Sequence, residues 1–177
     1  MFAPARHREA LFTLYAFNLE IARIRDTVSE PLIGRMRLQW WRDAIESIGR
    51  GEPPKHPVAQ ALAATMTGYV LSRDHFAVLI DSREGDMRDE PPASLQELIE
   101  YAEGTSVPLL RLSLEVLGVS DGPAHAVARR VGKAWALTGL MRAVPFHLAA
   151  GRSFLPADLC AAYGVSLDGV SPARPSA

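Results

Sequence analysis

The stretch that decides the fold runs from Ala10 to Glu46 and reads ALFTLYAFNLEIARIRDTVSEPLIGRMRLQWWRDAIE. Two apolar stripes follow each other in it at helical spacing, and the turn signal Ser29-Glu30-Pro31 separates them. A helix with one apolar face is stable only when that face packs against a partner. The stretch therefore predicts two neighbouring helices in a bundle. The first stripe consists of Leu11, Leu14, Tyr15, Leu19 and Ile21, and the second of Leu32, Met36, Trp40, Trp41, Ala44 and Ile48.

The rest of the chain repeats this helical pattern, and no segment alternates with the two-residue period of a strand. A capping box at Ser94-Leu-Gln-Glu97 predicts a helix start, and Pro108 is expected to kink that helix without ending it. We therefore predict an all-α fold, with one domain over residues 1–168 and a disordered tail over residues 169–177. The expected helices span about residues 6–28, 31–49, 57–68, 72–80, 94–118, 124–144 and 156–164.

Composition narrows the classes of protein to which the chain can belong. Its 177 residues carry a net charge of -1, so no overall positive charge draws it to nucleic acid. Cys160 is the only cysteine and cannot form a disulfide within the chain, which favours a reducing compartment. No apolar run approaches the ~20 residues that cross a bilayer, and the N-terminus lacks a signal-peptide segment. We expect a cytoplasmic protein, with peripheral attachment to the inner membrane left open.

Few side chains stand out as candidates for metal binding. Asp81, Glu84, Asp86 and Asp89 could gather a divalent cation, because carboxylate oxygens suit Mg²⁺. A solvated helix end explains the same residues equally well. The five histidines show no zinc-site spacing, and no glycine-rich phosphate loop is present in the sequence.

The aromatic and basic side chains can each be interpreted in two ways, as part of the folded framework or as part of a ligand site. Trp40, Trp41 and Trp135 are expected in the core, since buried tryptophan is commoner than a tryptophan that forms a ligand platform. Arg142 stands near the end of an apolar helix, one turn after Thr138. There it could meet an anionic ligand or interact with the C-terminus of its own helix.

Four segments, in this order, resemble the squalene and phytoene synthase family of all-α isoprenoid synthases. They are LFTLYAFNLEIARIRD (11–26), RLQWWRDAI (37–45), EYAEGTSVPLL (100–110) and GKAWALTGLMRAVPFHLAAGRSFLP (132–156). The resemblance implies a helical cavity in which the tail of a prenyl diphosphate lies among apolar side chains. It also implies that two facing aspartate-rich helices hold the diphosphate through Mg²⁺, which neutralises the charge of the leaving pyrophosphate.

Both aspartate motifs that the family uses are altered in this chain. Where the family has Asp-Asp-x-x-Asp, residues 22–26 read ARIRD, so that only Asp26 keeps its acidic character. Where the family has Asn, Arg-Asp and a further Asp, the chain has Gly139, Arg142-Ala143 and His147. The residues of these segments most resemble a branch of the family that includes the mitochondrial complex I assembly factor. That branch also lacks the paired aspartates.

The resemblance therefore implies a protein that keeps the synthase fold for binding, or for the assembly of respiratory complex I, without prenyl condensation. No cofactor is expected in that case, and the partner would be a protein, with a prenyl lipid or prenyl diphosphate as a further ligand. One alternative is a Mg²⁺-dependent transferase that condenses farnesyl or geranylgeranyl diphosphate head to head, with Asp26 and Asp86 as metal ligands. A second is a helical interaction module unrelated in function. The candidate residues for binding the prenyl ligand are Arg37, Tyr101, Trp135 and Arg142.

The family domain continues with further long helices after the segment that ends at Pro156, whereas this chain continues with only a short remainder. We therefore expect a bundle that lacks its later helices and exposes apolar surface. Such surface favours association with a partner or with a second copy of the chain.

Overall fold

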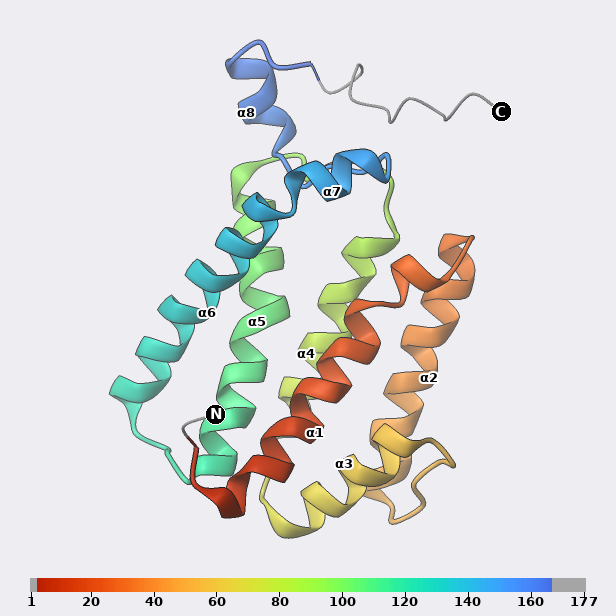
Figure 1. Ribbon diagram of the computed structural model, residues 1–177, viewed down its shortest axis with the longest axis vertical. Coiled ribbons are helices and arrows are strands. Elements are labelled where there is room, and N and C mark those ends of the chain that lie inside the picture. The colour runs from red at the N-terminus through yellow and green to blue at the C-terminus, as the bar shows by residue number, and fades with distance from the viewer. Residues whose placement is uncertain (1–2, 167–177) are drawn as a thin grey trace.

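The computed structural model describes residues 3–166 and confirms the all-α prediction (Figure 1). Helices account for the regular structure of this range, and it contains no strand. The expected tail over 169–177 lies outside the described residues. The elements are α1 (Ala5–Ala22), η1 (Arg25–Thr27), α2 (Pro31–Gly49), α3 (Pro57–Gly68), α4 (Arg73–Ser82), η2 (Arg83–Met87), α5 (Leu95–Leu117), α6 (Gly122–Arg142), α7 (Val144–Ala149) and α8 (Ala157–Ala162), where η denotes a 3₁₀ helix.

Two predicted helix ends are wrong, and local chemistry explains both. α1 ends at Ala22 and not near residue 28, because the chain tightens into η1, where the Thr27 hydroxyl donates to the carbonyl of Ile24. Such a side-chain bond to the backbone competes with α-helical pairing. α6 ends at Arg142, two residues early, because Pro145 lacks the amide hydrogen that would continue the ladder.

The predicted helix starts and stops around α5 are confirmed. The Ser94 hydroxyl accepts a hydrogen bond from the amide of Glu97, and the Glu97 carboxylate accepts one from the amide of Ala93. The helix runs through Pro108 and ends at Leu117, and the residue that caps it, Gly118, has a positive φ of 72°. Glycine adopts this left-handed conformation without the steric cost that other residues bear.

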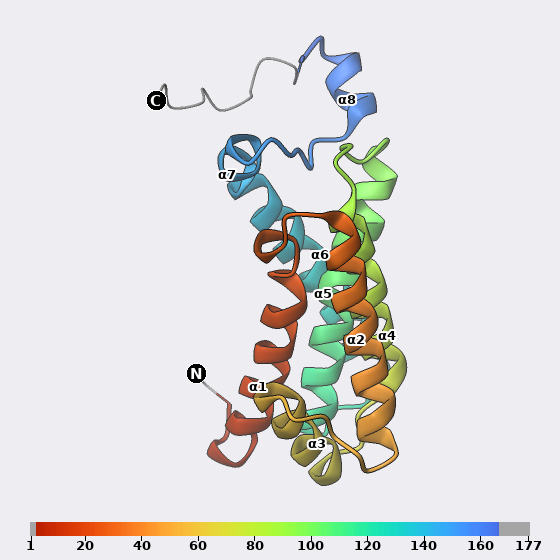
Figure 2. The ribbon, with the colours of Figure 1, turned by 90° about the vertical axis from the view of Figure 1, so that its right-hand side faces the viewer.

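Helix α5 lies at the centre of the bundle (Figures 1 and 2). It packs against α4, α6 and α1, and α2 and α3 complete the side on which α1 and α4 lie. α1 and α6 both run toward the same end of the bundle, and α7 lies across that end (Figure 1). This arrangement places η1, η2, the start of α5 and the end of α6 near one another.

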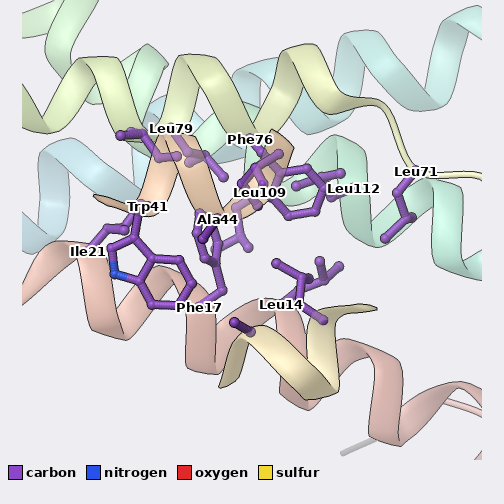
Figure 3. Close-up of a cluster of buried hydrophobic side chains, with 14 of the residues drawn as sticks. Leu14, Phe17, Ile21, Trp41, Ala44, Leu71, Phe76, Leu79, Leu109 and Leu112 are labelled. Atoms are coloured by element: carbon purple, nitrogen blue, oxygen red, sulfur yellow. The ribbon is translucent and has the colours of Figure 1, made fainter. Parts of the chain in front are cut away.

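The hydrophobic core is built around the ring of Phe17, which is fully buried (Figure 3). Its centroid lies 5.2 Å from that of Trp41 and 5.3 Å from that of Phe76, both in edge-to-face geometry. Each such pair adds roughly 0.5–1.5 kcal/mol to the stabilisation that burial alone provides. One aromatic side chain of α1 thereby ties together α2 and α4.

Apolar residues of the predicted stripes that miss the core are exposed on α1 and α2. Tyr15 and Leu19 are 45% and 52% exposed on α1, and Met36 is 64% exposed on α2. On α6, only Ala128 and Gly132 are buried. These side chains are therefore open to solvent at the surface of the described bundle.

The expectation that the tryptophans lie in the core holds for only one of them. Trp41 is buried, whereas Trp40 is 40% exposed and Trp135 is 79% exposed. Trp135 is exposed because its face of α6 borders an open cavity and does not pack on another helix of the described chain.

Candidate functional site

A cavity of about 480 Å³ opens between α1, α5 and α6, at the end of the bundle that α7 crosses. Since α1 and α6 run toward α7 and α5 runs away from it, the charged residues of η1 and η2 lie at the α7 end of the cavity. Apolar side chains lie farther along it, among them Leu109 and Trp135. The cavity therefore has a charged end and an apolar end.

Asp86, Arg83 and Tyr101 form the most buried polar cluster of the charged end. The Asp86 carboxylate accepts a hydrogen bond from the Tyr101 hydroxyl at 2.5 Å and lies 3.4 Å from Nη1 of Arg83. The same Nη1 also donates to the Tyr101 oxygen at 3.0 Å. Asp86 and Arg83 are adjacent because the 3₁₀ turn of η2 places residues three apart on one face.

Burial dominates the electrostatics of this cluster. It raises the pKa of the Asp86 carboxyl above its usual range, against the opposing charge of Arg83. Burial and the neighbouring Asp86 also raise the pKa of Tyr101 well above its ordinary value. The Tyr101 hydroxyl therefore stays protonated and remains a hydrogen-bond donor to Asp86.

Several other carboxylates near this end of the bundle are also paired with arginines. Arg152 Nη2 lies 2.7 Å from Asp26 Oδ1, and Arg25 Nη2 lies 3.1 Å from Asp89 Oδ1. Farther out, Arg42 bridges two more carboxylates, those of Asp81 and Glu84, at 2.8 and 3.0 Å. The predicted acidic cluster is thus divided among several different guanidinium groups.

His147 contributes an imidazole to the cavity from α7. Its ring centroid lies 4.8 Å from that of Phe154, and the Phe154 ring in turn lies 5.2 Å from that of Tyr101. Burial lowers the pKa of His147, and the positive charge of Arg152 lowers it further. We therefore expect a neutral imidazole at pH 7.

Several buried polar atoms of the described residues have no hydrogen-bond partner, and most of them belong to this cavity. They are Asn18 Oδ1, Arg25 Nε, Arg83 Nε and His147 Nδ1, all on residues that line it. Buried polar atoms in folded proteins are nearly always satisfied, by protein, water or ligand. Their concentration here makes the charged end a candidate site for water or for a polar group of a ligand.

The structure brings four of the predicted site residues together. Asp26, Asp86, Tyr101 and Trp135 all line the cavity. The positions compared with the two aspartate motifs also meet there, Asp26 from the first and, from the second, Gly139, Ala143 and His147.

Two predicted binding residues lie elsewhere. Arg37 lines a separate hollow beside Trp40 and donates from Nη1 to the Thr27 hydroxyl at 2.8 Å. Arg142 is exposed at the end of α6 and does not line the cavity. Arg37 on α2 and Arg142 on α6 each lie on a side of their helix that does not border the cavity.

The residues present do not fit a magnesium site of the aspartate-rich kind. The two candidate ligands Asp26 and Asp86 are both occupied by guanidinium groups, and Ala143 and His147 stand at the positions of the second motif. Within residues 3–166, no three side chains of the His, Cys, Asp or Glu type come together as a set of metal ligands. Hard oxygen donors are what Mg²⁺ requires, and the charged end supplies mainly nitrogen donors of positive charge.

Sequence reasoning missed Arg83 and Arg152 as residues of the site. Arg152 is 126 positions from its partner Asp26, so no local pattern connects them. The only signal was the segment GRSFLP within the family resemblance, which contains both Arg152 and Phe154. Arg83 lies in the charged segment after α4, where its pairing depends on the η2 turn.

The family model described as squalene/phytoene synthase matches residues 1–177. This chain belongs to the squalene/phytoene synthase family.

The family relatives that the chain resembles carry two kinds of name. The chain is 41% identical over 163 residues to the NADH dehydrogenase (ubiquinone) complex I assembly factor 6 of Bos taurus, covering 92% of this chain and 49% of the relative. It is 30% identical over 157 residues to the presqualene diphosphate synthase of Sinorhizobium fredii, covering 88% of this chain and 55% of the relative. The chain thus spans about half the length of these curated relatives.

The fold agrees with solved members of the squalene/phytoene synthase family. The squalene synthase HpnC from Alicyclobacillus acidocaldarius superimposes with a TM-score of 0.82 at 23% identity, over 99% of this chain and 65% of that structure. This confirms the isoprenoid-synthase-like bundle, and the matched structure is longer than the chain. No helix within residues 3–166 combines the length and the apolar character needed to cross a membrane.

Proposed function

We propose that this member of the squalene/phytoene synthase family is non-catalytic and acts in the assembly of respiratory complex I. The observation that carries the proposal is the pairing of Asp26 with Arg152 and of Asp86 with Arg83. These carboxylates are the best ligands that the cavity could offer to Mg²⁺, and each is already neutralised by a guanidinium. The 41% identity to the bovine assembly factor supports the role in complex I.

The physical case against prenyl condensation rests on charge. Ionisation of a prenyl diphosphate leaves a pyrophosphate, whose charge the family neutralises with Mg²⁺ held by clustered carboxylates. In this chain Arg23 and Arg25 stand within the first motif, and Ala143 and His147 replace acidic residues of the second. A metal ion in the cavity would have to displace arginines from both Asp26 and Asp86 before it could bind.

The same proposal includes a protein partner. The exposed apolar side chains of α1 and α6, among them Tyr15, Leu19 and Trp135, offer a surface on which such a partner could pack. A place in complex I assembly would bring the chain to the periphery of the inner membrane, where it would act from the aqueous side.

A second candidate function is head-to-head condensation of prenyl diphosphates. The 30% identity to the presqualene diphosphate synthase of Sinorhizobium fredii favours it. In that case Asp26 and Asp86 would be the magnesium ligands, and their arginine partners would move to the diphosphate.

Two measurements on the full chain separate these functions. The first is turnover of labelled farnesyl and geranylgeranyl diphosphate with and without Mg²⁺. We expect no condensed product and no release of pyrophosphate. Mg²⁺-dependent formation of a condensed product would overturn the non-catalytic proposal and establish the second candidate.

The second measurement is disruption of the gene in its own organism. We expect loss of assembled complex I on native gels and loss of NADH:ubiquinone oxidoreductase activity in membranes. The wild-type chain and the Asp26→Asn variant should both restore the complex, since no metal ligand is needed. Normal complex I together with a loss of C30 isoprenoids would contradict the proposal.

A further inference from the structure

Helix α2 carries a row of exposed apolar side chains. Met36 is 64% exposed, and Leu32 and Trp40, one turn before and one turn after it, are 61% and 40% exposed. Residues four apart lie above one another on a helix, so these three side chains form one row. The buried residues of α2, among them Leu38 and Ile45, lie on the opposite side, and α2 stands at the edge of the bundle (Figures 1 and 2). The row therefore faces away from the core.

Two arginines flank this row. Arg35 and Arg37 are the sequence neighbours of Met36, and a helix turns by about 100° per residue, so they point to opposite sides of the row. Both arginines are exposed, and residues 31–42 contain no carboxylate. Within residues 3–166 neither arginine forms an ion pair, and Arg37 donates to the hydroxyl of Thr27. The row thus combines apolar side chains with positive charge that no carboxylate neutralises.

A hollow of about 680 Å³ between α1, α2 and α7 continues this surface. Its lining includes three exposed apolar side chains and two arginines, which are Leu19, Trp40, Phe146, Arg23 and Arg37. Arg23 is exposed and forms no ion pair within the described residues. Of the two carboxylates in the lining, Asp26 is held by Arg152, and Glu20 lies 4.0 Å from Nε2 of His56. The positive charge of Arg23 and Arg37 therefore remains available at the surface.

The indole of Trp40 is supported by two neighbouring rings. Its ring centroid lies 4.9 Å from that of Trp41 and 5.3 Å from that of His56, both in edge-to-face geometry. A tryptophan that is partly exposed and held in place presents an apolar ring with one polar N–H group. Side chains of this kind are enriched where a membrane meets water.

A second copy of the chain is a poor occupant of this surface. In a two-fold dimer the same patch meets itself, so Arg35 and Arg37 would approach the same arginines of the other chain. Like charges brought together are unfavourable at an interface. An anionic bilayer offers the complementary arrangement, because its apolar interior lies beneath a layer of phosphates.

We propose that this surface docks on an anionic phospholipid bilayer. We call it the lipid face, and it consists of Leu32, Met36, Trp40, Arg23, Arg35 and Arg37. The apolar members enter the headgroup region by about 5–10 Å, and the arginines contact lipid phosphates. The inference deepens the proposed function and rests on the location that it gives the chain, at the periphery of the inner membrane, because it names the surface that meets the lipid. The cavity between α1, α5 and α6 takes no part in it.

The test is co-sedimentation of the full chain with vesicles of phosphatidylcholine, alone or with about one third phosphatidylglycerol. We expect the chain to bind the anionic vesicles at least about tenfold more tightly, since the two mixtures share the same apolar interior and differ in charge. Raising the salt concentration to about 1 M should weaken this binding several-fold, because the Debye length then falls to about 3 Å.

Tryptophan fluorescence shows which residue reaches the lipid. In the Trp135→Phe variant, Trp40 is the exposed tryptophan and Trp41 is buried. Anionic vesicles that contain phosphatidylcholine brominated on its acyl chains should quench the emission of this variant. Adding Trp40→Phe should remove the quenching, and quenching that persists would contradict the insertion of Trp40.

Variants with matched changes of charge make the proposal specific. Met36→Glu places a carboxylate in the apolar row and should weaken binding to anionic vesicles by about tenfold or more. Its control is Val131→Glu on α6, which alters an apolar side chain that is also exposed. Arg35→Gln should weaken binding by about fivefold, and its control is Arg50→Gln, an exposed arginine near Glu46 at the end of α2. Both controls should bind as the wild type does, and unchanged melting curves exclude unfolding as a cause.

Four results would overturn the proposal. They are no binding to vesicles, equal binding to neutral and anionic vesicles, loss of binding in Val131→Glu but not in Met36→Glu, and a dimer that Met36→Glu dissociates in the absence of vesicle binding. The gene disruption remains a separate test. Vesicle binding together with normal complex I in the disrupted strain would contradict the proposed function, whereas loss of complex I without vesicle binding would contradict this inference alone.

Discussion

Arg152 donates a hydrogen bond from Nη2 to Oδ1 of Asp26 across 2.7 Å, although 126 positions separate the two residues in the chain. The pair joins the loop after α7 to η1, and so it fastens the segment that crosses the end of the bundle. It also occupies the one acidic residue that the chain retains from the first aspartate motif. The packing of α7 and the access to that carboxylate therefore depend on the same contact.

Removing the ion pair between Arg152 and Asp26 should lower global stability only slightly but should loosen α7 more strongly. Asp26 is 47% exposed, so that solvent screens the pair, and Arg152→Ala should lower the free energy of unfolding by less than about 1 kcal/mol. Hydrogen exchange of α7 should accelerate, because the fastening contact is gone. Urea unfolding and exchange mass spectrometry measure the two effects. Arg50→Ala, the control, should leave α7 unchanged, and equal exchange of α7 in both variants would argue against the fastening role.

The Asp86 cluster should matter far more for stability. Asp86→Ala leaves Arg83 buried without its partner, which typically costs about 3–5 kcal/mol. Tyr101→Phe removes only the hydroxyl that donates to Asp86 and should cost about 1–3 kcal/mol. Chemical denaturation measures both values. The exposed Asp43→Ala, which loses a hydrogen bond from Gln39, is the control, and a similar cost for Asp86→Ala would refute the assigned burial.

Acidification should destabilise the protein partly through His147. Because the pKa of His147 is lowered in the folded state, this residue contributes stability above its unfolded pKa of 6.5. That contribution is lost as the pH falls below 6.5 through the folded pKa. The unfolding free energy of His147→Gln should therefore fall less than that of the wild type over that range.

Comparing the variant with the wild type separates the pH-dependent contribution of His147 from the contributions of two other groups with shifted pKa values. Burial also lowers the pKa of His75, which remains in both proteins. The pKa of Asp86 is raised, so that its contribution is lost as the pH rises and has the opposite sign. Identical pH profiles for His147→Gln and the wild type would show that His147 titrates normally.

Two tryptophans offer a test of which apolar side chains support the fold and which line the binding cavity. Trp41→Ala removes a buried ring that contacts Phe17 and should cost about 3–5 kcal/mol. Trp135→Ala alters a side chain that is 79% exposed and should change stability by less than about 0.5 kcal/mol. Trp135→Ala should nevertheless weaken any binding of farnesyl diphosphate, because Trp135 lines the cavity in which a prenyl tail is expected. A stability loss like that of Trp41→Ala would place Trp135 in the core after all.

Helix positions were predictable because their signals are local. The capping residues at Ser94 and Glu97, the glycine at Gly118 and the prolines at the starts of α2 and α3 act within a few residues of themselves. The end of α1 was less accurate, although its cause is also local: the hydroxyl of Thr27 bonds to the carbonyl of Ile24 and tightens the chain into η1.

The burial of the first helix was only partly predictable because α1 has two apolar faces. Leu14, Phe17 and Ile21 face the core, whereas Tyr15 lines the cavity. The predicted stripe combined residues of both faces and omitted Phe17, the ring at the centre of the core. A periodic pattern identifies a helix, but it cannot say which of two apolar faces packs on a neighbour and which remains open.

The sequence by itself determined that the chain is an all-α member of a synthase family whose metal-binding aspartates are largely replaced. Residue identities alone carry that information, and helix signals are local. Only the tertiary structure decided how the remaining carboxylates are used. Asp26 and Asp86 could have served a metal ion until folding placed Arg152 and Arg83 against them. The physical reason is that an ion pair depends on a distance of a few ångströms, and that distance is set by the packing of helices far apart in sequence.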